Sequence, residues 1–183
     1  MPIYTRTGDT GTTALFGGTR VLKCNDLVDV YGSIDELNSW IGFVSSKLNT
    51  IESQEFLSRL QSDLFTIGSN FAGFKTDISH LHERVLEMEA RIDAMDKALP
   101  KLTKFILPGG SELGAVVHLA RGVCRRVERQ TVALHQTQPV DLTIISYLNR
   151  LSDFLFMLAR FVNKELGATE VIWSAIDRVN KKK

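Results

Sequence analysis

The stretch LVDVYGSIDELNSWIGFV, residues 27–44, has the periodicity of an amphipathic helix. Its apolar residues recur at three- and four-residue steps, the spacing of one face of an α-helix. They are Leu27, Val30, Ile34, Leu37, Ile41 and Val44. The stretch therefore predicts a helix from about Asp26 to Leu48.

The same periodicity predicts further helices over about 53–73, 111–136 and 140–167, and a segment rich in Glu, Arg, Met and Ala predicts another over about 79–99. Pro100 ends the third helix, Ser111 is suited to cap the fourth, and Gly167 is suited to stop the fifth. No segment forms a convincing strand pattern. Together the helices predict an all-α fold, a five-helix bundle with a ferritin-like, four-helix-bundle core.

The segment FLFMLARFV, residues 154–162, is apolar nearly all round. Such a helix either lies at the centre of a bundle or faces a partner subunit. Phe154, Phe156 and Phe161 provide more apolar surface than one small bundle should need. We therefore expect part of this surface to meet a second subunit.

Composition predicts a single domain over residues 1–183, because 183 residues at 44% hydrophobic can bury one sizeable core. We divide it into an arm (1–25), a helical bundle (26–167) and a tail (168–183) whose lysines are expected to be solvated. A net charge of +1 gives no support for binding nucleic acid or an anionic membrane. Two distant cysteines and no signal-peptide pattern predict a soluble, cytoplasmic protein.

Polar residues flank the apolar stripes of three helices. They are Asp35 and Asn38 on the first, Arg121, Arg125 and Glu128 on the fourth, and Asn149 on the fifth. The RRVER run (125–129) is most often a solvated face with local ion pairs. Asp35 and Arg121 could likewise form one structural ion pair. Asn149 is harder to explain in this way, because a half-buried amide needs partners.

Metal and covalent chemistry have little support in the sequence. His80, His82, His118 and His135 do not form a Glu-x-x-His pattern repeated on two helices, so a ferritin-like di-iron site is not expected. No nucleophile motif such as Gly-x-Ser-x-Gly is present. We therefore expect no metal site built from protein ligands.

The N-terminal segment YTRTGDTGTTALFGG, residues 4–18, is rich in threonine and glycine. Gly8 and Gly11 allow backbone N–H groups to approach an anion closely, and Arg6 adds positive charge. Taken alone, the pattern equally suits a disordered arm. Together with Lys23 and the arginine helix, it suggests an arm that folds over a polyphosphate.

Five blocks of the chain, in order, resemble the PduO-type ATP:cob(I)alamin adenosyltransferases. They are residues 4–18, VYGSIDELNSWIG (30–42), FILPGG (105–110), RGVCRRVERQ (121–130) and YLNRLSD (147–153). The resemblance implies a homotrimeric helical bundle with active sites between subunits and an irregular N-terminal nucleotide-binding arm. It also implies transfer of the 5′-deoxyadenosyl group of ATP to cob(I)alamin, with release of triphosphate.

The resemblance also implies roles for individual residues. The ATP-binding set is Thr5, Arg6, Thr7, Gly8, Thr13, Ala14, Lys23, Arg125, Arg126, Val127, Glu128, Arg129 and Asn149. Phe105 is expected to pack against the corrinoid, and Asp35 with Arg121 to form an ion pair between subunits. These three residues and Arg125 form the catalytic set. Mg²⁺ is expected to be held through the ATP phosphates.

The sequence departs from the family pattern at two positions. Ala14 stands where a serine is common, which leaves only backbone contact there, and Ser33 replaces a threonine. Neither change removes a charged group. We expect neither to affect the activity.

Two other kinds of function remain open. The arginine helix could serve a nucleic-acid-binding module, although the near-zero net charge argues against it. A bundle that senses nucleotides without turnover would share the same ATP-binding residues. Detection of triphosphate with an adenosylated product separates that function from the enzyme.

Overall fold

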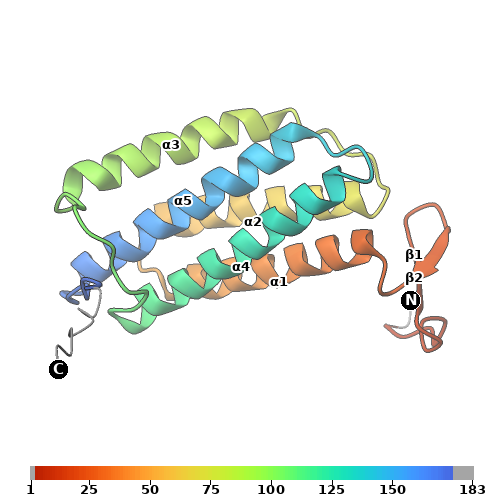
Figure 1. Ribbon diagram of the computed structural model, residues 1–183, viewed down its shortest axis with the longest axis horizontal. Coiled ribbons are helices and arrows are strands. Elements are labelled where there is room, and N and C mark those ends of the chain that lie inside the picture. The colour runs from red at the N-terminus through yellow and green to blue at the C-terminus, as the bar shows by residue number, and fades with distance from the viewer. Residues whose placement is uncertain (1–2, 175–183) are drawn as a thin grey trace, which may run out of the picture.

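The computed structural model describes residues 3–174, which form five helices and a two-stranded hairpin (Figure 1). The helices are α1 (Asp26–Lys47), α2 (Ile51–Phe71), α3 (His80–Ala98), α4 (Glu112–His135) and α5 (Leu142–Glu165). Every boundary lies within about two residues of the one predicted from the sequence. The predicted all-α five-helix bundle is confirmed.

Side chains just before three of the helices fix where they begin. Asn25, Ser111 and Asp141 each accept a hydrogen bond from a backbone N–H in the first turn, at 2.8–3.0 Å. Such caps satisfy amides that have no partner within the helix. The predicted cap at Ser111 is confirmed. Gly167 has φ +65° just after α5, as expected for a C-terminal stop.

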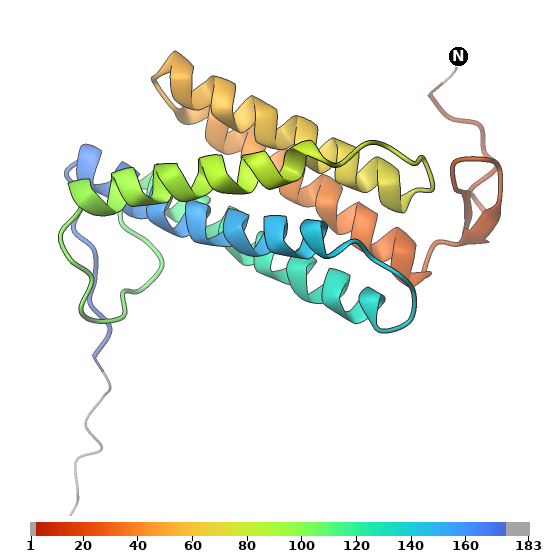
Figure 2. The same ribbon diagram turned by 90° about the horizontal axis from the view of Figure 1, so that it is seen from above.

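The helices pack as an extended bundle, seen from two sides in Figures 1 and 2. α1 packs on α2 and α4, α4 packs on α5, and α3 lies along α5. Leu37, Leu64 and Leu148 are completely buried in the core. α5 contacts both α3 and α4, and it has more buried residues than any other helix.

The packing of α5 between α3 and α4 explains most of the apolar run at 154–162. Phe154 is buried, with its ring centroid 5.2 Å from that of Phe56, so it belongs to the core of this chain. Of the two alternatives left open for this run, Phe154 takes the one inside the bundle, whereas Phe156 and Phe161 are only partly buried. Within residues 3–174, α5 alone has the length and hydropathy of a membrane span, and much of it is buried in the bundle.

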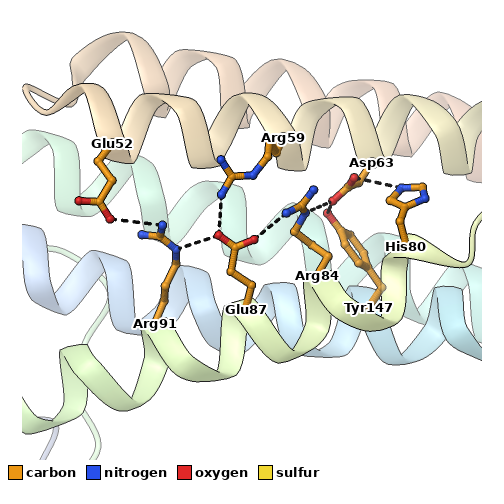
Figure 3. A network of polar contacts seen from close by, with 8 residues as sticks. All are labelled: Glu52, Arg59, Asp63, His80, Arg84, Glu87, Arg91 and Tyr147. Atoms are coloured by element: carbon orange, nitrogen blue, oxygen red, sulfur yellow. Dashed lines mark hydrogen bonds and ion pairs between the residues drawn. The ribbon is translucent and has the colours of Figure 1, made fainter.

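A chain of polar side chains ties α3 to α2 (Figure 3). Buried Asp63 on α2 accepts hydrogen bonds from Arg84 Nε at 2.7 Å and from the Tyr147 hydroxyl at 3.3 Å. Glu87 then bridges Arg84 and Arg59, at 2.6 and 2.5 Å. Burial opposes ionisation of Glu87, but these two guanidinium groups hold its pKa below the usual value. Ion pairs therefore contribute to the attachment of α3.

The bundle has two different ends. The arm lies at one end, beside the start of α1, and the loop 100–111 with residues 168–174 lies at the other (Figures 1 and 2). The arm is not wholly irregular, because β1 (Thr12–Ala14) and β2 (Arg20–Leu22) form an antiparallel pair. Three-residue strands are too short for a recognisable alternation, which explains why the sequence indicated no strand.

Candidate nucleotide and corrinoid site

The arm brings together residues predicted to bind ATP. Arg20 Nη2 donates to the Thr7 carbonyl and to Thr12 Oγ1, both at 2.5 Å, and so ties the turn at 5–8 to the hairpin. Lys23 N donates to the Gly11 carbonyl at 2.9 Å. A Cβ atom on Gly8 would lie 3.3 Å from Lys23 Nζ, so the ammonium group lies against the Gly8 backbone.

Most polar groups of the arm are exposed. Thr5, Arg6 and Thr7 all face solvent, and Arg6 has a left-handed φ of +59°. Thr13 is half-buried and Ala14 exposed in β1. Arginine and lysine cations, hydroxyls and glycine amides on one small surface are suited to an anion with many oxygens.

Phe16 attaches the arm to the bundle. Its backbone N–H donates to the Ala72 carbonyl at 2.8 Å, and its ring packs edge-on against Phe74 at 4.4 Å between centroids. Both partners follow directly after α2. The threonine- and glycine-rich turn precedes Phe16 in the chain and takes no part in these two contacts.

The residues of the RRVER run on α4 lie in three different environments. Val127 is completely buried in the core. Arg126 forms an ion pair with Glu36 of α1. Arg125 and Arg129 are exposed, and Arg129 Nη1 donates to the Arg125 carbonyl at 3.1 Å. Among the described residues no carboxylate lies within 4 Å of the Arg125 guanidinium, so it is not neutralised by a local ion pair.

Glu128 takes a different partner from the one expected of a surface helix. It accepts a hydrogen bond from Asn149 Nδ2 of α5 at 2.9 Å, instead of pairing with Arg125. The bond fixes the Asn149 amide and leaves its carbonyl oxygen available to a donor. The two residues, predicted to bind ATP from different helices, are therefore adjacent.

Arg121 and Asp35 lie on different faces of the subunit. The half-buried Arg121 guanidinium lies 5.2 Å from the centroid of Phe156 on α5. Burial lowers its pKa, and the charge of Arg125 acts in the same direction. Asp35 is exposed in a groove between α1 and α2, beside Tyr31 and Phe65. Residues 3–174 contain no Asp35–Arg121 ion pair, so the two residues do not form the predicted pair within one chain.

Phe105 lies at the other end of the bundle from the arm. Its side chain is 80% exposed, and its ring centroid lies 6.4 Å from that of Trp173. The loop that carries it precedes α4, whereas Arg125 lies thirteen residues into that helix, about 20 Å further along its axis. One subunit therefore does not bring Phe105 together with the predicted ATP-binding residues.

Sequence reasoning missed several residues that shape these surfaces. Arg20, Glu36 and Asp29, which accepts from Gln130 Nε2 at 2.5 Å, hold predicted site residues or their neighbours in place. Arg20 could have been noticed as a further cation of the arm, but the partners on α1 depend on helix packing. Within residues 3–174, no three His, Cys, Asp or Glu side chains cluster to hold a metal ion.

Comparisons with known proteins show the family to which this fold belongs. A family model described as "Cobalamin adenosyltransferase" matches residues 3–162. A corrinoid adenosyltransferase of Bacillus subtilis is 42% identical, over 93% of this chain and 91% of its own length. The human corrinoid adenosyltransferase MMAB is 37% identical, over 96% of this chain and 74% of its own.

Solved structures show the same fold. A variant of a PduO-type ATP:corrinoid adenosyltransferase from Lactobacillus reuteri, in complex with cobalamin and ATP, superposes with a TM-score of 0.88. It is 33% identical to this chain, and the match covers 95% of this chain and all of the other. On the sequence, the fold and these relatives together, the chain belongs to the cobalamin adenosyltransferase family.

Proposed function

We propose that this protein transfers the 5′-deoxyadenosyl group of ATP to the cobalt of cob(I)alamin and releases triphosphate. The observation that carries the proposal is the exposed Arg125 guanidinium, which has no carboxylate partner within residues 3–174 and lies beside the hydrogen-bonded Glu128–Asn149 pair. The Lactobacillus reuteri relative binds both ATP and cobalamin. The blocks of this chain that resemble the family contain the residues that we expect to meet the same ligands.

The reaction forms a bond between cobalt and C5′ and breaks the bond between C5′ and the triphosphate oxygen. The cobalt supplies the electron pair for the new bond, and the triphosphate leaves with the pair of the broken bond. Since the substrate is the nucleophile, the protein needs no nucleophilic side chain. Its task is to align the reactants and to stabilise the leaving group.

The charged groups of the chain suit the second task. Arg125 and Arg129 are exposed cations on one helix, and Lys23 lies against the Gly8 backbone of the arm. We propose that all three neutralise the triphosphate, while Thr5, Thr7, Thr13 and the Gly8 and Ala14 backbone donate hydrogen bonds to it. Arg6 adds charge at the arm, and Arg126 and Val127 hold the helix in position.

The Glu128–Asn149 pair suits the nucleoside. Because Asn149 Nδ2 already donates to Glu128, its carbonyl oxygen is oriented to accept from a ribose hydroxyl or an adenine amino group. Glu128 keeps a second carboxylate oxygen for another donor. Mg²⁺ would be held by the ATP phosphates, because the described residues offer no cluster of metal ligands.

The separation of Phe105 from Arg125 supports a site shared between subunits. We propose a homotrimer in which Asp35 of one subunit pairs with Arg121 of the next, and in which Phe105 forms a dry wall against the corrinoid. Phe156 and Phe161, which one subunit leaves partly exposed, would be covered by the neighbour. We expect the protein to act in the cytoplasm on small molecules, with neither nucleic acid nor membrane as partner.

The test is an anaerobic reaction of the purified protein with ATP, Mg²⁺ and chemically reduced cobalamin. We expect the corrinoid spectrum to change to that of adenosylcobalamin and triphosphate to appear in equal amount. ATP binding without either product would favour the nucleotide sensor. No spectral change with folded protein under reducing conditions would refute the enzyme.

A further inference from the structure

The loop 100–111, which carries the exposed Phe105 side chain, is held by polar groups of α5 at both of its ends. At its start, the guanidinium of buried Arg160 donates to the Pro100 carbonyl at 3.0 Å. At its end, buried Asn163 contacts residues 109–111. A loop with an exposed aromatic ring therefore has a backbone fixed by two buried side chains.

Asn163 uses all of its hydrogen-bonding groups but one on this loop. Its Oδ1 accepts from Ser111 N at 2.9 Å and from Ser111 Oγ at 2.8 Å, and its Nδ2 donates to the Gly109 carbonyl at 2.8 Å. Ser111 Oγ in turn accepts from Gly114 N at 3.0 Å and so caps α4. One amide therefore joins the loop, the start of α4 and the end of α5.

The backbone around Asn163 leaves space for it. A Cβ atom on Gly110 or on Gly114 would overlap the Asn163 amide, so the side chain occupies the space that these two glycines leave empty. Gly110 also has φ +105°, which side chains rarely adopt. Neither glycine can become alanine while Asn163 keeps its position.

The segment after α5 holds the middle of the loop. Leu107 N donates to the Val171 carbonyl and Trp173 N to the Phe105 carbonyl, both at 2.8 Å. Glu170, at the start of this segment, accepts from Arg160 Nε at 3.2 Å. Arg160 therefore connects the segment to the loop, while the Phe105 ring stays 80% exposed.

We propose that Asn163 is a positioning residue for the corrinoid: it fixes the backbone of 109–111 and thereby the place at which Phe105 meets the substrate. This inference rests on the proposed function. Nothing in the nucleotide surface touches Asn163, because the arm lies at the opposite end of the bundle (Figure 1). Loss of Asn163 should therefore affect the two substrates unequally.

The kinetic test compares Asn163→Ala with Lys164→Ala. The control residue is the next one on α5, and its Nζ donates to the Ala98 carbonyl of α3 at 2.8 Å, outside the Phe105 loop. We expect Asn163→Ala to raise KM for cob(I)alamin by about tenfold, with KM for ATP within about twofold of the parent. The control should change neither constant.

Ser111→Ala is a milder variant in case Asn163→Ala folds poorly. It removes one of the three hydrogen bonds to Asn163 and should give a smaller change in the same direction. Equal changes in both KM values, or none in either, would overturn the proposal in whichever variant is folded. The first result would indicate general destabilisation.

Amide hydrogen exchange tests the positioning without any catalysis. In Asn163→Ala the amides of Leu107 and Ser111 should exchange at least about tenfold faster, while those of α1 should not change. If these loop amides keep their protection, Asn163 does not hold the loop. If the parent protein transfers no adenosyl group, the proposed function fails, and the exchange result still decides whether Asn163 fixes the loop.

Discussion

The two ends of the bundle differ in whether their polar side chains are exposed to solvent or buried with hydrogen-bond partners. At one end Thr5, Arg6 and Thr7 of the arm are exposed, and so is Arg125 about halfway along α4, which has no carboxylate partner in the described chain. At the other end, Arg160 and Asn163 are almost completely buried and form hydrogen bonds to the Phe105 loop. One end offers unused donors and charges, and the other offers a fixed apolar ring.

The difference matches what the two proposed substrates require. A triphosphate needs cations and N–H groups that remain free until it binds, so its site keeps them exposed. A corrinoid ring needs a surface of fixed position, since an aromatic wall contributes through its place alone. The predictions below test whether the ends act separately and whether a neighbouring subunit joins them.

The largest expected effect is that of removing residues 1–13. The deletion should abolish measurable ATP binding in calorimetry, because it takes away the threonine- and glycine-rich turn. The melting temperature and helix content should change little, since the anchor at Phe16 remains. Corrinoid binding should persist. If ATP affinity survives the deletion, the arm is not part of the nucleotide site.

Arg125→Ala should have the next largest effect. Loss of a cation aimed at the leaving triphosphate should lower kcat by about 10²–10³-fold, and Arg125→Lys should restore little, because an ammonium lacks the guanidinium fork. Arg59→Ala is the matched control, since Arg59 of α2 pairs with Glu87 on α3, away from the proposed site. A decrease of about threefold or less, under ~1 kcal/mol, would favour a merely solvated arginine face.

Asp35→Arg and Arg121→Asp test the connection between the ends. Each single change should weaken the trimer and reduce activity by roughly tenfold or more, because it leaves a partly buried charge unpaired. The double variant should recover part of both if the residues touch across the interface. Sedimentation measures the assembly. A parent protein that is active as a monomer would contradict the shared site.

Glu87→Gln should have the smallest effect and should alter neither substrate. The folded-state pKa of Glu87 is lowered, so its contribution to stability is present above the unfolded value of 4.5 and is lost as pH falls through the folded pKa. The melting temperature of the variant should therefore be about 2 °C lower at pH 7 and should depend less on pH below 4.5. Melting curves over this pH range, with ATP and corrinoid affinities measured at pH 7, provide the test.

Much of the fold could be predicted from local sequence. Apolar spacing predicted four of the helices and composition predicted the third, while Ser111 and Gly167 marked helix ends. Periodicity and caps depend on residues within a turn of one another. The hairpin of the arm could not be predicted, since each strand has only three residues.

The candidate site was only partly predictable. The residue types for phosphate binding stood out in the arm and on α4, and the family blocks assigned them to ATP. Their partners did not stand out: Glu36 lies ninety positions from Arg126, and their ion pair exists only because α1 packs on α4. The placement of Phe105 far from Arg125 also follows from helix direction and not from any motif.

The sequence by itself determined the five helices, the composition of the arm and the membership of the family, because each depends on residue types in a short stretch or in a fixed order. The tertiary structure alone decided which charges are free and which are paired. It left Arg125 without a carboxylate partner among the described residues, turned Glu128 toward Asn149, and placed Asn163 against Ser111 from 52 positions away. Contacts between helices arise from the packing of whole helix faces, so no local sequence pattern predicts them.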